Sequence, residues 1–199
     1  MGGALGEAWA RHGHEVFFGV RNPDSADAKA LLHRCGPRAR ATFVDDAVRE
    51  GEVVVVALPW PATKTVLESV NLTGKIVLDC TNPLKADLSG LEVGTTTSGG
   101  EMVAEWAKGA HVVKIFNTTG YGNMENPLYG GEHITMFYCG DDTDAKQTAA
   151  ELARTCGFDP IDAGPLANAR LLEPYALLWI WLAMRGGQGR DFAFKLLRR

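Results

Sequence analysis

Arg21 and Gly2 are the first residues of this chain whose types and spacing could bind a ligand. Residues 3–12 have the pattern of a small-residue helix, Gly13 ends it, and residues 15–20 form a strand-like run that leads to Arg21. This order matches the second half of the nucleotide-binding fingerprint G-x-G-x-x-G, whose third glycine lets a helix pack closely on the sheet. Gly2 has the place of that third glycine. Arg21 follows Gly2 by about 20 residues, which is the spacing at which an acidic residue would contact the adenine ribose.

The arginine at this place changes the expected cofactor. A planar guanidinium can stack on adenine and pair with a 2′-phosphate, whereas a carboxylate favours NAD. Arg21 therefore predicts a preference for NADP(H), the alternative being a solvated surface arginine.

The next strand ends in a second candidate segment. Residues 52–58 include four consecutive valines, as in a parallel strand covered on both faces, and Ala57-Leu58-Pro59 follows them. Ligands bind outside the carboxyl ends of strands in an open α/β sheet. A small residue and a proline there would let ribose and phosphates pass close to the backbone. The alternative is simple strand termination.

Two asparagines follow the later strands. Asn82 comes after a buried strand over residues 75–80, and Asn117 comes after another over residues 112–116. Each could present an amide on the nicotinamide side of the site. Asn82 precedes a proline, however, and Asn-Pro is also typical of a turn.

Other polar residues have simpler interpretations. Lys114 lies within a strand, with a solvent-facing or a salt-bridged head. Ser98 and Glu101 begin a helix whose free N–H groups could hold an anion, but the pair more simply forms a capping box. Asp141, Asp142 and Asp144 form an acidic cluster before a helix, and such a cluster more often stabilises the helix N-terminus than binds a metal. We assign no metal ligand, because the histidines lack metal-ligand spacing and the cysteines and histidines form no cluster. We assign no catalytic residue, because hydride transfer between two bound cofactors needs no protein acid or base.

Helix and strand signals alternate along residues 1–163, which predicts a Rossmann-type, doubly wound, mostly parallel α/β sheet. The first strand and the first two glycines of the fingerprint are absent, so we expect the sheet to lack its usual first strand. Residues 164–199 form a small C-terminal helical extension. Its long helix covers residues 165–184, with a kink at Pro174, and a short helix covers residues 191–197.

Bulk composition limits the class of protein. The chain has 199 residues, a net charge of −4 and no Lys/Arg block, so we expect no nucleic-acid partner. Four scattered cysteines without a C-x-x-C pair, no signal-peptide pattern and no apolar run long enough to span a bilayer predict a cytoplasmic protein without a membrane partner.

Nearly the whole chain resembles a known family. The motifs are Gly19-Val20-Arg21-Asn22-Pro23, Leu58-Pro59-Trp60, Asp79-Cys80-Thr81-Asn82-Pro83, Val112-Val113-Lys114-Ile115-Phe116-Asn117-Thr118, Cys139-Gly140-Asp141-Asp142 and the stretch over residues 162–173. They are similar to the NADPH-dependent deazaflavin (coenzyme F-420) reductase family, and equally to the NADP-binding reductase domain of the STEAP ferric reductases. The segment from Lys114 to Thr118 is more like the STEAP domain.

The resemblance implies a homodimer that binds NADP(H) across the strand ends, with a flavin or deazaflavin ring near the nicotinamide. Carried over to this chain, it implies that Arg21 contacts the 2′-phosphate with help from Val20 and Asn22. It also implies that residues 57–59 line the cofactor path and that Asn82 and Asn117 approach the nicotinamide. Val20 replaces the Ser or Thr often found there, which removes one hydrogen bond to the 2′-phosphate.

Three functions are therefore weighed. The leading one is an NADP-dependent oxidoreductase that exchanges a hydride with a small flavin or deazaflavin acceptor. A reductase of small imine or keto substrates, like pyrroline-5-carboxylate reductase, is disfavoured because about 35 residues after Gly164 are few for its helical domain. The third is a truncated nucleotide-binding module without catalysis, because the missing strand and glycines predict weak cofactor binding.

Overall fold

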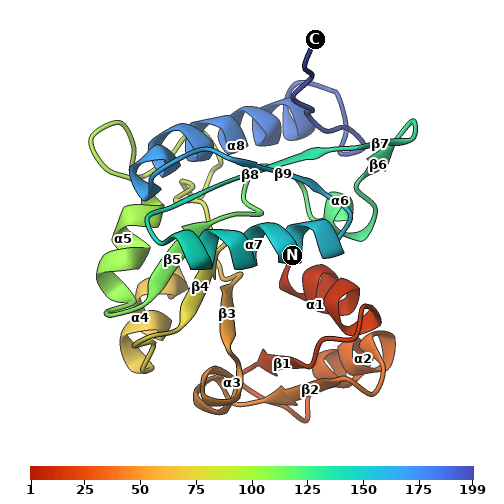
Figure 1. Cartoon of the computed structure of the whole chain (residues 1–199), viewed down its shortest axis with the longest axis vertical. Coiled ribbons are helices and arrows are strands. Elements are labelled where there is room, and N and C mark those ends of the chain that lie inside the picture. Colours follow the sequence, from red (N-terminus) through yellow and green to blue (C-terminus); the bar gives the residue numbers. More distant parts are fainter.

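Helices and strands alternate along most of the chain in the computed structural model, which describes residues 1–199 (Figure 1). In chain order they are α1 (Gly2–Arg11), β1 (Val16–Gly19), α2 (Ala26–Cys35), β2 (Ala39–Thr42), α3 (Val44–Glu50), β3 (Val53–Val56), α4 (Trp60–Ser69), β4 (Ile76–Asp79), α5 (Gly99–Trp106), β5 (His111–Lys114), α6 (Gly122–Glu125), β6 (Leu128–Tyr129), β7 (Glu132–His133), β8 (Thr135–Gly140), α7 (Thr143–Thr155), β9 (Asp159–Asp162), the 3-10 turn η1 (Leu166–Asn168) and α8 (Ala169–Met184).

The strands confirm the predicted mostly parallel sheet. Five strands pair in the order β3-β4-β5-β8-β9, and only the β5–β8 pair is antiparallel. Strands β1 and β2 form a separate parallel pair that is not hydrogen-bonded to β3. The interruption falls between β1 and β3, where a doubly wound sheet has its first strand. The expectation that this strand is lacking is confirmed.

Alternate residues of the central strands are buried on opposite faces of the sheet. Val77 and Val112 belong to a core with residues of α4 and α5, whereas Leu78 and Val113 belong to a larger core that includes α1 and α7. Side chains in a strand point to opposite faces in turn, so these continuous apolar runs fill both layers. The largest of the four buried clusters contains 17 residues, which makes the α1–α7 side the main core.

Helix α1 approaches the sheet closely because its glycines leave room. A Cβ at Gly6 would lie 2.5 Å from the Phe18 ring. Gly13 ends the α1 segment at φ +96°, a left-handed conformation that favours glycine. Both observations agree with the predicted helix–turn–strand beginning of the chain.

The C-terminal part differs from the prediction in one element. The expected helix over residues 191–197 is wrong, because this segment is not helical. Its two phenylalanines are two residues apart, and both pack on α8. Phe192 stacks on Trp179 with ring centroids 5.1 Å apart, and the Phe194 ring lies 5.0 Å from the Tyr175 ring. The Phe194 carbonyl also accepts a hydrogen bond from the Thr135 amide at 3.3 Å. These contacts favour an extended strap over an isolated helical turn.

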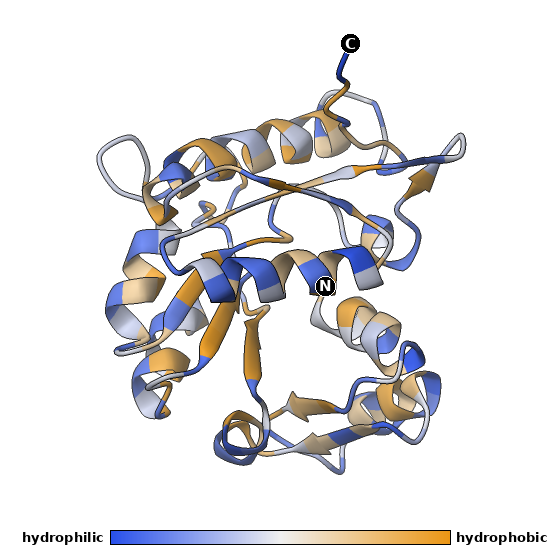
Figure 2. Cartoon of the chain, viewed as in Figure 1, coloured by the Kyte–Doolittle hydropathy of each residue, from blue (hydrophilic) through white to orange (hydrophobic).

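Helix α8 ends at Met184 as expected, but it begins at Ala169 and not at Pro165, because residues 166–168 form the 3-10 turn η1. The helix continues through Pro174. Figure 2 shows hydrophobic residues along the length of α8, which lies on the opposite side of the molecule from β1 and β2. None of the helices has both the length and the apolar character needed to cross a membrane. The boundary between residues 163 and 164 stays a prediction.

Candidate cofactor-binding site

The predicted site residues follow three neighbouring parallel strands in register. Val56 of β3 pairs with Asp79 of β4, and Asp79 pairs with Lys114 of β5. Pro59, Asn82 and Asn117 each come three residues after these partners. The three segments therefore leave the sheet at the same edge, where open α/β sheets bind ligands.

Gly2 lies at this edge as well. A Cβ on Gly2 would come within 3.3 Å of the Ala57 Cβ, so the start of α1 is in close contact with the segment after β3. Leu58 is half-buried and Pro59 is exposed as the residue before α4. The structure thus brings Gly2 against Ala57, a close packing of the kind that the fingerprint requires of its third glycine.

Arg21 follows β1 with an exposed side chain that has no ion pair or hydrogen bond within the chain. Val20 is held to the neighbouring strand, because its amide donates to the Thr42 carbonyl at 2.9 Å. The Asn22 side-chain oxygen accepts from the Asp24 amide at 3.0 Å and so shapes the turn. An unpaired guanidinium on an ordered turn is suited to bind a phosphate.

Asn82 and Asn117 contact each other directly. Asn82 Nδ2 donates to the Asn117 carbonyl at 2.9 Å, and Asn117 Nδ2 donates to Asn82 Oδ1 at 3.0 Å. Asn117 Nδ2 also lies 3.4 Å from the Leu172 carbonyl of α8. Asn117 Oδ1 is buried and has no hydrogen-bond partner in the chain. Native proteins seldom leave such an atom unpaired, so it fits a ligand that brings a donor.

The backbone before Asn117 is strained. Phe116 is fully buried and has φ +63°, a left-handed conformation that is rare for a bulky residue and costs about 1–3 kcal/mol. Its ring packs edge-on against Trp9 of α1 at 5.8 Å and against Phe158 at 6.0 Å. These contacts hold the conformation that turns the chain from β5 toward Asn117.

A buried charged cluster lies directly behind the asparagines. Lys114 Nζ lies 2.9 Å from Asp79 Oδ2, 2.8 Å from Glu173 Oε1 and 2.6 Å from the Thr81 carbonyl. All three charged side chains are fully buried. Burial opposes the charged form of Lys114, but the two carboxylates outweigh it and hold its pKa above the usual value. Of the two predicted positions for the Lys114 head, the salt-bridged one is confirmed and the solvent-facing one is wrong.

Helix α5 completes the cluster from its N-terminus. Glu173 Oε2 and Oε1 accept from the amides of Gly99 and Gly100, both at 2.9 Å. The Ser98 hydroxyl accepts from the Glu101 amide at 3.2 Å and contacts Glu101 Oε2 at 2.7 Å. The predicted cap is therefore present, and the anion at this helix N-terminus is the carboxylate of Glu173 itself.

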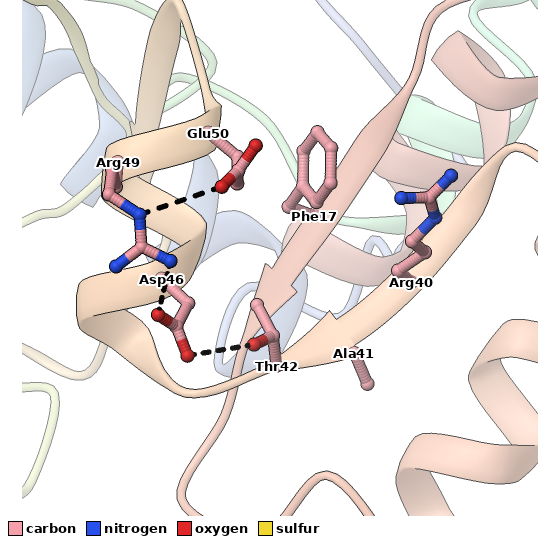
Figure 3. Close-up of a pocket in the computed structure, with 7 residues that line it drawn as sticks. All are labelled: Phe17, Arg40, Ala41, Thr42, Asp46, Arg49 and Glu50. Atoms are coloured by element: carbon pink, nitrogen blue, oxygen red, sulfur yellow. Dashed lines mark hydrogen bonds and ion pairs between the residues drawn. The ribbon is translucent and has the colours of Figure 1, made fainter.

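A separate open hollow of about 430 Å³ lies on β1, β2 and α3 (Figure 3). Asp46 contacts both Arg49, at 2.6 Å, and Thr42, at 3.4 Å, while Arg49 also lies 3.5 Å from Glu50. In this hollow Asp46, Arg49 and Glu50 are paired with one another. None of the predicted site residues lines the hollow. The candidate site is therefore the strand-end edge.

Comparison with known proteins agrees with this assignment. Residues 1–83 match the family described as NADP oxidoreductase, coenzyme F420-dependent. A solved structure from Arthrobacter sp. FB24, a candidate F420-dependent NADP reductase, superposes with a TM-score of 0.85 and 31% identity. This superposition covers 98% of the present chain and 94% of the other. The chain belongs to the coenzyme F420-dependent NADP oxidoreductase family. It is an NADP-dependent oxidoreductase with a Rossmann-type fold.

Two curated relatives extend the comparison. The F420-dependent NADP reductase of Methanocaldococcus jannaschii is 28% identical, over 86% of this oxidoreductase and 83% of the relative. Metalloreductase STEAP3 of Rattus norvegicus is 32% identical over 85% of this chain, but the match spans only 33% of that longer protein. The comparisons therefore confirm the resemblance of the sequence both to the deazaflavin reductases and to the STEAP reductases.

Sequence reasoning missed the role of Glu173. It is the only acidic residue of α8, in the otherwise apolar stretch from Leu171 to Met184, and such a carboxylate needs a buried partner. Lys114 is likewise a lone charge in an apolar strand. Opposite charges in two apolar elements were the available signal for this pair.

Proposed function

We propose that this oxidoreductase transfers a hydride between NADP(H) and a deazaflavin of the F420 type. The observation that carries the proposal is the buried, unpartnered Oδ1 of Asn117 at the aligned ends of β3, β4 and β5. It provides an acceptor for the amide of a nicotinamide carboxamide, at the edge where this fold class binds dinucleotides.

Different residues of the chain contact different parts of the cofactor. Arg21 pairs with the 2′-phosphate, beside Val20 and Asn22. Gly2 and residues 57–59 allow the middle of the cofactor to pass close to the backbone. Asn82 holds Asn117 in place through two hydrogen bonds: its Nδ2 donates to the Asn117 backbone carbonyl, and its Oδ1 accepts from Asn117 Nδ2. Because Asn117 Nδ2 is already hydrogen-bonded, Asn117 presents only its side-chain oxygen to the nicotinamide.

When bound, NADPH would supply a hydride and become NADP⁺, and the acceptor would take up that hydride together with one proton from solvent. The protein's contribution is orientation and exclusion of water, since the reactivity belongs to the cofactors. The strained turn at Phe116 fixes the direction of Asn117 relative to β5.

The choice of deazaflavin over flavin rests on the M. jannaschii relative, which the chain matches along most of its length. The test is NADPH oxidation by the purified chain with F420 and with FMN in parallel, with NADH in place of NADPH as the control. Faster turnover with F420 supports the proposal. Turnover with FMN alone, or with neither acceptor, contradicts it.

We also propose that two copies of the chain associate through α8. Leu171, Pro174, Leu178 and Trp181 are exposed at spacings of three, four and three residues, and the side chains of Leu171, Leu178 and Trp181 are 66%, 49% and 51% exposed. Such spacing places apolar side chains on one stripe, the pattern of a helix–helix seam. A helix can pair with its own copy about a twofold axis. Light scattering should report a dimer, and Leu178→Lys should yield the monomer; a monomeric parent protein contradicts the proposal.

The four cysteines are all free and buried, which fits a reducing compartment such as the cytoplasm. Fractionation of expressing cells tests this placement.

A further inference from the structure

The buried cluster of Asp79, Lys114 and Glu173 connects three parts of the fold at the candidate site. Asp79 ends β4, Lys114 ends β5, and Glu173 comes from α8. The Lys114 ammonium lies within 2.9 Å of both carboxylates, so it joins the two strand ends to the C-terminal helix.

Each carboxylate also fixes backbone groups. Asp79 Oδ1 accepts from the Thr81 amide at 2.9 Å and from the Thr81 hydroxyl at 2.7 Å. Together with the bond from Lys114 to the Thr81 carbonyl, these contacts set the chain immediately before Asn82. Glu173 meanwhile anchors α8 on the amides of Gly99 and Gly100.

Helix α8 reaches the second asparagine as well. Leu172, the residue before Glu173, has its carbonyl 3.4 Å from Asn117 Nδ2. The cluster therefore determines the position of both members of the Asn82–Asn117 pair, although none of its three side chains is exposed.

We propose that Glu173 is a positioning residue for the nicotinamide half of the cofactor site, acting through Lys114 and the backbone of α8 on Asn82 and Asn117. The inference rests on the proposed function. It extends that function by giving the C-terminal helix a role in orienting the reacting ring, separate from binding of the adenosine half at Arg21.

The test compares two ligands by calorimetry on the full chain. NADP⁺ carries the nicotinamide, whereas adenosine 2′,5′-bisphosphate carries only the half expected at Arg21. Glu173→Gln keeps the size of the side chain and removes its charge. It should weaken NADP⁺ binding about tenfold, through a misplaced hydrogen bond to a buried group, and leave the affinity for adenosine 2′,5′-bisphosphate unchanged.

Two further variants separate positioning from general loosening. Arg170→Gln breaks an ion pair with Glu101 between the same two helices without contacting Lys114, and should keep both affinities. Asn117→Ala should reproduce the selective loss of NADP⁺ affinity. Adding Glu173→Gln to Asn117→Ala should then have little further effect, because the two residues act on one contact.

The outcomes are distinct. If the parent chain binds neither ligand, the proposed function fails and the inference fails with it. If the parent binds both and Glu173→Gln weakens both equally or neither, the positioning role alone is overturned. Should Glu173→Gln fail to fold, as judged by circular dichroism, Asp79→Asn weakens the other arm of the cluster and is subject to the same two outcomes.

Discussion

Lys114 Nζ lies 2.8 Å from Glu173 Oε1, and both side chains are fully buried. The pair joins the last residue of β5 to the N-terminal part of the C-terminal helix, across 59 residues of sequence. A buried ion pair gains little net stability over apolar residues of the same volume, because both charges lose their hydration. Removing one partner, however, leaves an uncompensated charge in the interior.

Lys114→Met tests this asymmetry. The variant keeps an unbranched side chain but leaves Asp79 and Glu173 without their cation, so the free energy of unfolding should fall by roughly 3–5 kcal/mol. Urea denaturation measures the change. Lys146→Met is the matched control, because its Nζ also lies 2.9 Å from a carboxylate, that of Asp162, at a partly exposed position. The control should cost about 1 kcal/mol or less. Equal losses for the two variants would contradict the account.

Gly100→Ala tests the close contact between α5 and α8. A Cβ there would lie 2.9 Å from the Ala169 Cβ and 3.4 Å from the Lys114 Cδ. Overpacking of this kind should cost about 1–3 kcal/mol, although alanine is the better helix former. Gly122→Ala is the control, since nothing lies within 4 Å of its Cβ position. Thermal unfolding should show a lower Tm for Gly100→Ala only; an unchanged Tm would mean that the helices are less closely packed.

Tyr175 predicts a loss of stability at alkaline pH. Burial raises its pKa to about 12. An unfolded tyrosine ionises near pH 10, so between about pH 10 and 12 the unfolded chain binds fewer protons than the folded one. Stability therefore falls with rising pH in this window, by up to about 2 kcal/mol from this residue.

Tyr175→Phe should remove that part of the pH dependence while keeping the ring contacts with Phe137 and Phe194. Denaturation curves at pH 8 and pH 11 measure it. Tyr121→Phe gives the matched control, because the Tyr121 side chain is 54% exposed and its hydroxyl leaves no buried group behind. If the free energy of unfolding fell equally between pH 8 and pH 11 in Tyr175→Phe and in the parent chain, the role of Tyr175 would be disproved.

The sequence predicted the sheet and the two asparagines for one physical reason. Consecutive parallel strands end at the same edge, so Asn82 and Asn117 had to lie near each other once their strands were identified. Glu173 could not be placed in this way, because its contact with Lys114 depends on how α8 packs and not on any local pattern. Local helix propensity also misled at the C-terminus, where Phe192 and Phe194 follow the two-residue period of an extended chain.

The short hairpin of β6 and β7 was predictable but was not predicted. Gly130 and Gly131 separate the two strands, and both have positive φ. A two-residue glycine loop between short strands is a strong hairpin signal, because the favoured turn needs left-handed residues. Short strands with few apolar residues gave no periodicity to support it.

The most direct test of the cofactor assignment is the ratio of the dissociation constants for NADH and NADPH, measured on the parent chain, on Arg21→Ala and on Arg40→Ala. Arg40 lies on the neighbouring strand β2, packs over the Phe17 ring, and controls for the loss of one positive charge. The account predicts that the parent prefers NADPH by about 10- to 100-fold, the effect of charge-assisted hydrogen bonds to the 2′-phosphate. Arg40→Ala should keep this preference and Arg21→Ala should abolish it. Equal affinity of the parent chain for both cofactors, or a preference that survives Arg21→Ala, would contradict it.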